Sequence, residues 1–128
     1  MSIKFLFLVV IITVIISQSS STVITMYPTM RCNNGNWCYS LTLLEKDLIS
    51  DDTLQTASKK CTKEDVTTTS ISGKVVDDGW LDHVVEIAVS INHNCTSNGK
   101  YTKYETDEYK FDLDDDSKKS AEFTATFP

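Results

Sequence analysis

The sequence predicts an all-β protein, an antiparallel β-sandwich of about seven to eight short strands. Apolar residues recur with a period of two over much of the chain, which is typical of strands with one buried face. Clusters of Asn, Asp and Gly separate these runs, as turns do between strands. One stretch, Leu48–Lys60, has some helical character, but its periodicity is poor.

The alternation is clearest in the second half of the chain. From Val85 to Asn92 large aliphatic residues alternate with small or polar ones, and Tyr109–Asp114 and Glu122–Phe127 repeat the pattern. Each run is expected to form a strand with one buried and one solvated face. β-branched and aromatic content predicts further strands at Thr22–Met30, Tyr39–Glu45, Thr68–Val76 and Tyr101–Glu105.

The N-terminus has the pattern of a secretory signal peptide. Lys4 precedes the apolar run Phe5–Ile16, and small or polar residues follow up to Ser21. The run is 12 residues long, whereas a membrane span takes about 18 or more, so a retained anchor is disfavoured. We expect residues 1–21 to be a signal peptide and residues 22–128 to be one secreted domain without a transmembrane segment.

The exported part is acidic. Without Lys4 it holds 11 basic and 18 acidic residues, a net charge of −7. Such a surface repels nucleic acid and does not favour anionic membranes. Nucleic acid is therefore not an expected partner.

The cysteines and the lack of nucleophile motifs argue against an enzyme. Cys32, Cys38, Cys61 and Cys95 all lie in the exported part, where an even number predicts two disulfides, with three pairings open. Oxidised cysteines are not nucleophiles. Ser, His and Asp occur, but no Gly-x-Ser-x-Gly or comparable context surrounds a serine. We therefore expect no catalytic activity.

No cofactor or metal is expected either. His93 and Cys95 are two positions apart on a strand end, but zinc needs three or four ligands, and a disulfide would consume Cys95. Asp112, Asp114 and Asp116 have the spacing that begins a calcium loop. The Gly and Glu that complete an EF-hand are absent, which leaves only a looser calcium site as the alternative to a solvated turn.

Two further features concern the surface. Asn94-Cys95-Thr96 is an N-glycosylation sequon, although cysteine at the middle position makes Asn94 a weak acceptor. Trp37 and Trp80 each lie beside a turn, where we expect them to cover an end of the core. The alternative is that they are exposed anchors for a partner.

Several blocks of sequence together resemble the nematode transthyretin-like family of secreted proteins. Its members typically carry a Cys-Asn-Gly loop, a strand ending in Glu-Lys-Asp, a Phe-x-Leu-x-Gly segment and a strand ending in Ile-Tyr-His-x-Cys. The corresponding blocks are Cys32–Gly35, Ser40–Asp47 followed by Ser50–Leu54, Ser70–Gly73, and Ile91–Cys95. Their order and approximate spacing match, although no single block is specific.

The departures from that family indicate a divergent member. Asn92 stands where the family usually has Tyr, the Pro after the Gly loop is absent, and so is a second cysteine after the His-x-Cys block. Cys38 and Cys61 are extra, and a gained pair is most easily kept if its members bond each other. The resemblance therefore favours the pairs Cys38–Cys61 and Cys32–Cys95.

The resemblance implies a transthyretin-type β-sandwich that acts in the extracellular space or at the cell surface as a non-catalytic binding or carrier protein. The expected partner is a protein receptor or cell surface. A small apolar ligand is the second candidate partner. The alternative is a structural or inhibitor-like secreted protein that acts by oligomer assembly or protein contact. Loop tips carry recognition on sandwiches, which makes Asn34, Gly35, Asp78, Trp80 and Asn98 the candidate contact residues.

Overall fold

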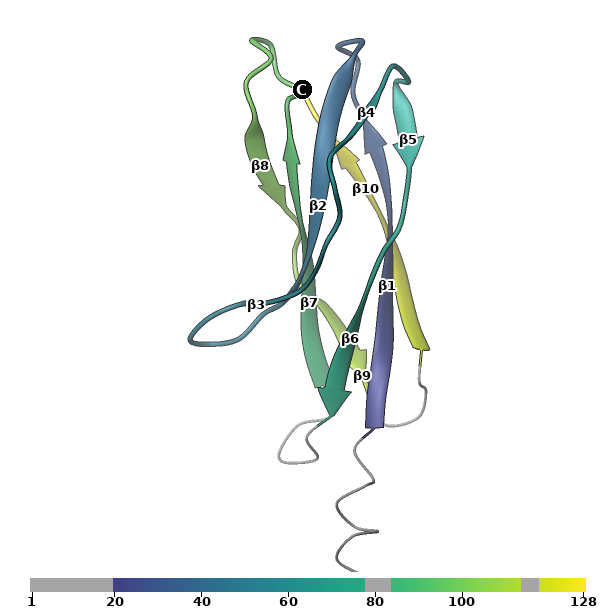
Figure 1. The fold of residues 1–128 in the computed structure, drawn as a ribbon, viewed down its shortest axis with the longest axis vertical. Helices are drawn as coiled ribbons and strands as arrows, with labels where there is room; N and C mark the ends of the chain where they lie inside the picture. The colour runs from purple at the N-terminus through teal and green to yellow at the C-terminus, as the bar shows by residue number, and fades with distance from the viewer. Residues whose placement is uncertain (1–19, 78–83, 114–117) are drawn as a thin grey trace, which may run out of the picture.

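The computed structural model describes residues 20–77, 84–113 and 118–128, and all but the last two residues of the predicted signal peptide lie outside them. Within these ranges ten strands form two facing sheets and no helix occurs, so the predicted all-β sandwich is confirmed (Figure 1). The strands run along the long axis of the molecule. Most turns therefore lie at its two ends.

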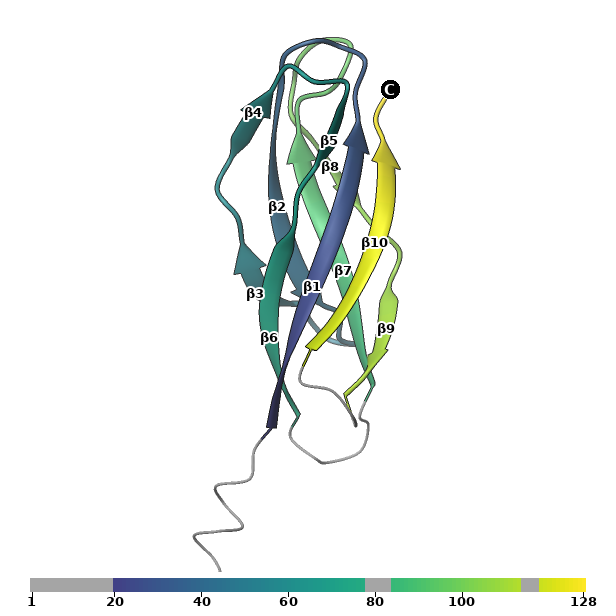
Figure 2. The ribbon, with the colours of Figure 1, turned by 90° about the vertical axis from the view of Figure 1, so that its right-hand side faces the viewer.

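The smaller sheet has β1 (Ser20–Arg31) at its centre. β6 (Ile71–Asp77) and β5 (Val66–Thr68) follow each other along one edge of β1, and β10 (Lys118–Thr126) lies along the other (Figure 2). β10 pairs with β1 in parallel and is the exception among the described strand pairs, since the others are antiparallel, as the sequence predicted. The chain reaches β10 from the opposite sheet, and such a crossover, unlike a tight hairpin, permits parallel pairing.

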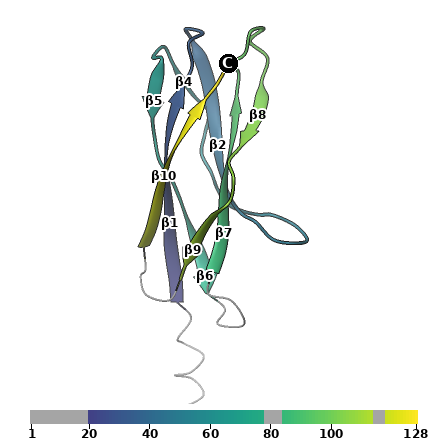
Figure 3. The same cartoon turned by 180° about the vertical axis from the view of Figure 1, so that it is seen from behind.

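The larger sheet is built around a central antiparallel pair, β2 (Trp37–Glu45) and β7 (Val84–His93). Two short strands extend it along each outer edge. β3 (Asp52–Thr56) and β4 (Lys60–Thr62) pair with β2, and β8 (Thr102–Glu105) and β9 (Tyr109–Asp112) pair with β7 (Figure 3).

The core lies between the sheets and follows the period-two pattern of the sequence. The apolar residues that alternate along β7 are all buried, and β1 and β2 contribute the same kind of inward row. Burial of such side chains contributes about 1.5–3 kcal/mol each and is the main stabilising term. The inward residues of these three strands are Ile24, Met26, Met30, Trp37, Tyr39, Leu41, Leu43, Val85, Ile87, Val89 and Ile91.

Three strands were not predicted, namely β3, β4 and β5. The helical character suggested for Leu48–Lys60 is wrong, because β3 and the start of β4 lie in that stretch. These strands are three to five residues long and mostly exposed. They are held by backbone pairing to a long neighbour and leave little apolar periodicity in the sequence.

Gly73 lets the two sheets approach at one edge. A Cβ added there would lie 2.9 Å from the Cβ of Leu54 and 3.1 Å from Cδ2 of Leu43. We expect Gly73→Val to lower the free energy of unfolding by about 1–3 kcal/mol through overpacking, measured by urea denaturation. The exposed neighbour supplies the control, Lys74→Val, which should leave stability nearly unchanged. Equal losses in both variants would contradict a steric origin.

Candidate functional site

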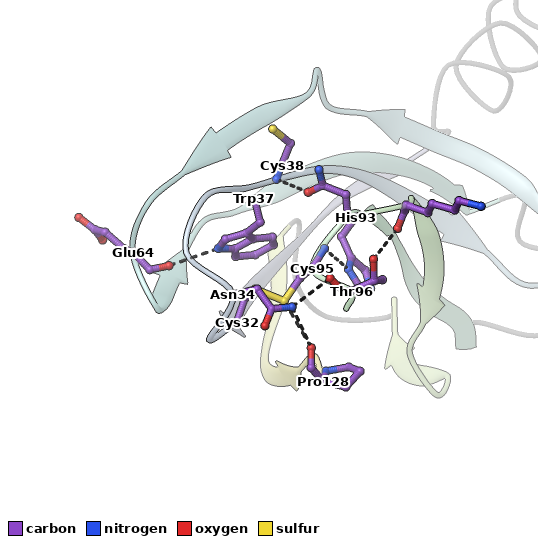
Figure 4. The surroundings of a disulfide bond; sticks show 11 residues. Cys32, Asn34, Trp37, Cys38, Glu64, His93, Cys95, Thr96 and Pro128 are labelled. Atoms are coloured by element: carbon purple, nitrogen blue, oxygen red, sulfur yellow. Dashed lines mark hydrogen bonds between the residues drawn. A yellow bond between two sulfur atoms is a disulfide. The ribbon is translucent and has the colours of Figure 1, made fainter. Parts of the chain in front are cut away.

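The end of the sandwich at the top of Figure 1 is covalently cross-linked. Cys32, which follows β1, is bonded to Cys95, which follows β7, so the bond joins the two sheets (Figure 4). Both cysteines are buried and their Cα atoms are 6.0 Å apart. This bond holds the strand ends, and therefore the loops that leave them, in a fixed relative position.

The second disulfide, Cys38–Cys61, lies within the larger sheet. Its two residues face each other in the ladder between β2 and β4, and Cys61 is exposed. It fastens a three-residue strand that has little buried surface of its own. The two bonds are the pairs that the family resemblance favoured.

Two of the three candidate contact loops meet at this end. Asn34 donates from Nδ2 to the carbonyl oxygen of Thr96 at 3.2 Å and to that of Pro128 at 3.4 Å (Figure 4). Gly35 and Gly99 adopt positive φ values of 78° and 70°, which Gly takes without strain. The structure thus brings Asn34 and Gly35 together with the loop that contains Asn98.

The third candidate loop falls in a part of the chain that the structure does not describe. Asp78 and Trp80 lie outside the described residues. The nearest described residues, Asp77 at the end of β6 and Val84 at the start of β7, lie at the opposite end of the sandwich (Figure 1).

The loop after β7 is stiffened by its own hydrogen bonds. The hydroxyl of Thr96 donates to the carbonyl oxygen of Lys100 at 2.9 Å, and the amide of Lys100 donates to Oδ1 of Asn98 at 3.1 Å. With Asn34 bound to Thr96, both loops have a defined shape before they meet any partner. A preformed loop loses less conformational entropy on binding.

Trp37 covers this end of the core, as the sequence predicted for it. Its ring is buried, 5.2 Å from the ring centre of Tyr39 and 5.8 Å from that of Phe127. Its Nε1 donates to the carbonyl oxygen of Glu64 at 3.2 Å. The tryptophan thus ties the β4–β5 connection to the same end of the molecule.

An open groove of about 410 Å³ runs beside Trp37 and the exposed disulfide. Asn94, the residue of the glycosylation sequon, lines this groove and is held in place by two hydrogen bonds with Cys38. Oδ1 of Asn94 accepts a hydrogen bond of 2.7 Å from the amide of Cys38, and the amide of Asn94 donates to the carbonyl oxygen of Cys38 at 3.2 Å. The groove is lined by Asn36, Trp37, Cys38, Cys61, Thr62, Lys63 and Asn94.

His93 is buried under this end, where it has a structural environment. Its ring stacks on that of Phe127 with a centroid distance of 3.8 Å, and Nδ1 accepts a hydrogen bond of 3.1 Å from the amide of Cys95. That bond requires Nδ1 to be unprotonated. Burial lowers the pKa of His93 below its ordinary value of 6.5.

The lowered pKa predicts a loss of stability in mild acid. His93 stays neutral in the folded protein, so its contribution is full above the unfolded pKa near 6.5 and is lost as the pH falls through the folded pKa. The free energy of unfolding should fall below pH 6.5 with a slope of at most about 1.4 kcal/mol per pH unit. His93→Gln should flatten this slope in urea titrations at several pH values. Parallel profiles for the two proteins would contradict the assignment.

The described ranges contain no group of three or more His, Cys, Asp or Glu residues placed to hold a metal ion. Cys95 is oxidised, which removes it from the His93–Cys95 pair considered as a metal site. Asp114 and Asp116 of the acidic turn lie outside the described residues. In the same ranges, no helix has the length and apolar character needed to cross a bilayer.

Sequence reasoning missed the groove and one exposed loop. The groove depends on β4, which was not predicted, so no sequence signal pointed to it. The loop between β2 and β3 carries Leu48 and Ile49, both fully exposed. The usable signal is a pair of adjacent aliphatic residues in a polar segment, with Asp47 before it and Ser50 after it.

Comparison with known proteins gives a nematode family. A Caenorhabditis elegans relative named "Uncharacterized protein B0416.7" is 32% identical over 71 residues, which cover 55% of this chain and 53% of the relative. The chain thus spans about half the length of the curated relative it matches. No solved structure gives a significant match. The family described as "Caenorhabditis elegans protein of unknown function (DUF870)" matches residues 28–127, most of the chain, and the chain therefore belongs to this family.

Proposed function

We propose that the protein is a secreted, non-catalytic binding module whose disulfide-linked end contacts an extracellular protein, such as a receptor on a cell surface. The observation that carries the proposal is the cross-linked pair of loops at that end. Cys32–Cys95 joins the strands that lead into them, and Asn34 bonds one loop to the other. Loops held on a rigid sandwich are a common recognition surface.

The chemistry of this end favours contact over catalysis. His93 is engaged with Cys95 and Phe127 inside the core, and all four cysteines are oxidised. The exposed parts offer amide, hydroxyl and lysine groups, which suit hydrogen bonding to a protein surface. The groove beside Trp37 is the place where a small apolar ligand would bind if the protein is a carrier.

Secretion and a distant relation to the nematode transthyretin-like proteins are part of the same proposal. The apolar N-terminal run and the disulfides support export. The Cys32–Gly35 and Ile91–Cys95 blocks that carry the resemblance are joined by a disulfide. Mass analysis of exported protein tests export directly, because an intact Met1 there would contradict cleavage of the predicted signal peptide.

The binding proposal is tested with fluorescently labelled mature protein on dissociated nematode cells. Binding should saturate, survive moderate salt and disappear after protease treatment of the cells. Asn34→Ala with Asn98→Ala should weaken it, because these changes loosen both loops. Lys74→Ala, at an exposed position of the smaller sheet, serves as the control. Equal binding to protein-free anionic liposomes, or no saturable binding, would contradict the proposal.

The second candidate is a structural or inhibitor-like protein that acts through assembly or protein contact. Edge strands at both sheets could support assembly, because unpaired strand edges pair with other chains. Native mass spectrometry separates the candidates. A stable oligomer without cell binding would favour this second function, and a retained apolar molecule would favour the carrier form of the first.

A further inference from the structure

A second surface lies away from the disulfide end, on the loop between β2 and β3. This loop projects from the sandwich in Figures 1 and 3. Leu48 and Ile49 stand at its tip with exposures of 103% and 96%. A lone exposed aliphatic residue is ordinary, but two adjacent ones that are fully exposed contribute no core packing.

The loop is anchored at its base. Nζ of Lys46 forms ion pairs of 2.7 Å with Asp51 across the loop and of 3.1 Å with Glu105 on β8. The carboxylate of Asp47 accepts a hydrogen bond of 2.6 Å from the amide of Leu48. These bonds present the two aliphatic side chains outward on a fixed base.

Next to the tip lies an open groove of about 460 Å³ with an acidic lining. Four carboxylates line it, and the one lysine of the lining, Lys46, is already paired with Asp51 and Glu105. Lys110, which is not part of the lining, lies 4.0 Å from Glu86 in a largely exposed ion pair, so the groove keeps a net negative charge. A hydrogen bond with Glu86 raises the pKa of Glu108, which indicates that these two carboxylates lie close together. A partner's cation would relieve their repulsion. The carboxylates are Glu45, Asp47, Glu86 and Glu108.

We propose that the Leu48–Ile49 tip and its acidic groove form a docking surface for a basic, apolar surface of another protein. The aliphatic tip would enter an apolar pocket, and the partner's Lys or Arg side chains would lie in the groove. Anionic lipid is the disfavoured occupant, because the same carboxylates repel it. The surface is separate from the disulfide end, so the inference goes beyond the proposed function.

The test uses the isotopically labelled mature domain and a synthetic amphipathic helix of Leu and Lys as the probe. Amide resonances of Asp47–Asp51 and near Glu108 should shift and saturate. Leu48→Ser with Ile49→Ser should weaken binding at least about tenfold without changing the melting temperature, since both side chains are fully exposed. The control is Tyr27→Ser with Val76→Ser, two exposed apolar residues on the smaller sheet, which should bind like the wild type.

Four outcomes would overturn the inference. The first is no saturable shift at the tip, and the second is an equal response to a Lys–Ser peptide of the same charge, which shows general electrostatic attraction only. The third is binding to phosphatidylcholine vesicles that depends on Leu48 and Ile49, which assigns the tip to lipid. The fourth is a dimer in sedimentation that the Leu48→Ser, Ile49→Ser variant loses, which makes a second copy the occupant.

The two proposals fail separately. Peptide binding at the tip without saturable cell binding keeps this surface and removes the proposed function. The opposite result is cell binding that is insensitive to Leu48→Ser and Ile49→Ser while the peptide gives no response. That result keeps the proposed function and removes this surface.

Discussion

Replacing Cys32 and Cys95 together by alanine is expected to lower the free energy of unfolding by about 4 kcal/mol, measured by urea denaturation. The two cysteines are 63 positions apart. Without the disulfide, the unfolded chain gains conformational entropy, which for a loop of that length lowers its free energy by about 4 kcal/mol. The buried sulfur atoms also pack in the core, so their loss adds to the effect.

The matched variant is Cys38→Ala with Cys61→Ala. Its loop is shorter, with a separation of 23 positions, and the same relation gives about 3 kcal/mol. The exposed bond should also be the first to be reduced by a dithiol under native conditions, because Cys61 is accessible and Cys32 and Cys95 are buried. A larger loss in the Cys38–Cys61 variant would show that the inter-sheet bond is not the main cross-link.

The second large effect is expected for Trp37→Ala, which should cost about 3–5 kcal/mol in thermal or urea unfolding. The ring fills the end of the core between Tyr39 and Phe127, and its loss leaves a cavity and an unpaired carbonyl at Glu64. Trp37→Phe keeps most of the packing and should cost clearly less. If Trp37→Ala were as stable as Tyr101→Ala, whose ring is exposed, the assigned role would be wrong.

The parts of the fold that could be predicted are those with a strong one-sided pattern. β7 and β10 alternate in the sequence because one face packs in the core, and the structure buries that face in β7 and partly buries it in β10. β3 and β5 could not be predicted, because their position depends on pairing with β2 and β1 and not on their own side chains. The parallel β1–β10 pair likewise follows from the crossover between sheets, which leaves no local signal.

The candidate site was predictable only in its covalent and turn elements. The cysteine pairs and the Asn34–Gly35 turn follow from residue types and the family resemblance. The stacking of His93 on Phe127 joins residues from opposite sheets, which no local pattern encodes. The exposure of Leu48 and Ile49 could not be predicted from periodicity, which identifies buried faces and does not identify apolar residues that remain outside.

The pairing of β1 with β10 has a consequence for the protein's synthesis. Val23 pairs with Lys118 and Arg31 with Thr126. β1 therefore cannot complete this pairing until nearly the whole chain has left the ribosome. Until then one edge of β1 is open, and an open edge is a template for aggregation. Pairings this distant along the chain also form slowly.

All four cysteines precede Lys118, so a chain that stops short of β10 still has every residue needed for both disulfides. Such a fragment would be fully oxidised yet would leave β1 uncovered along one side. The presence of both disulfides therefore does not show that β10 has been synthesised. Quality control would thus have to detect these fragments through their exposed strand edge and not through free thiols.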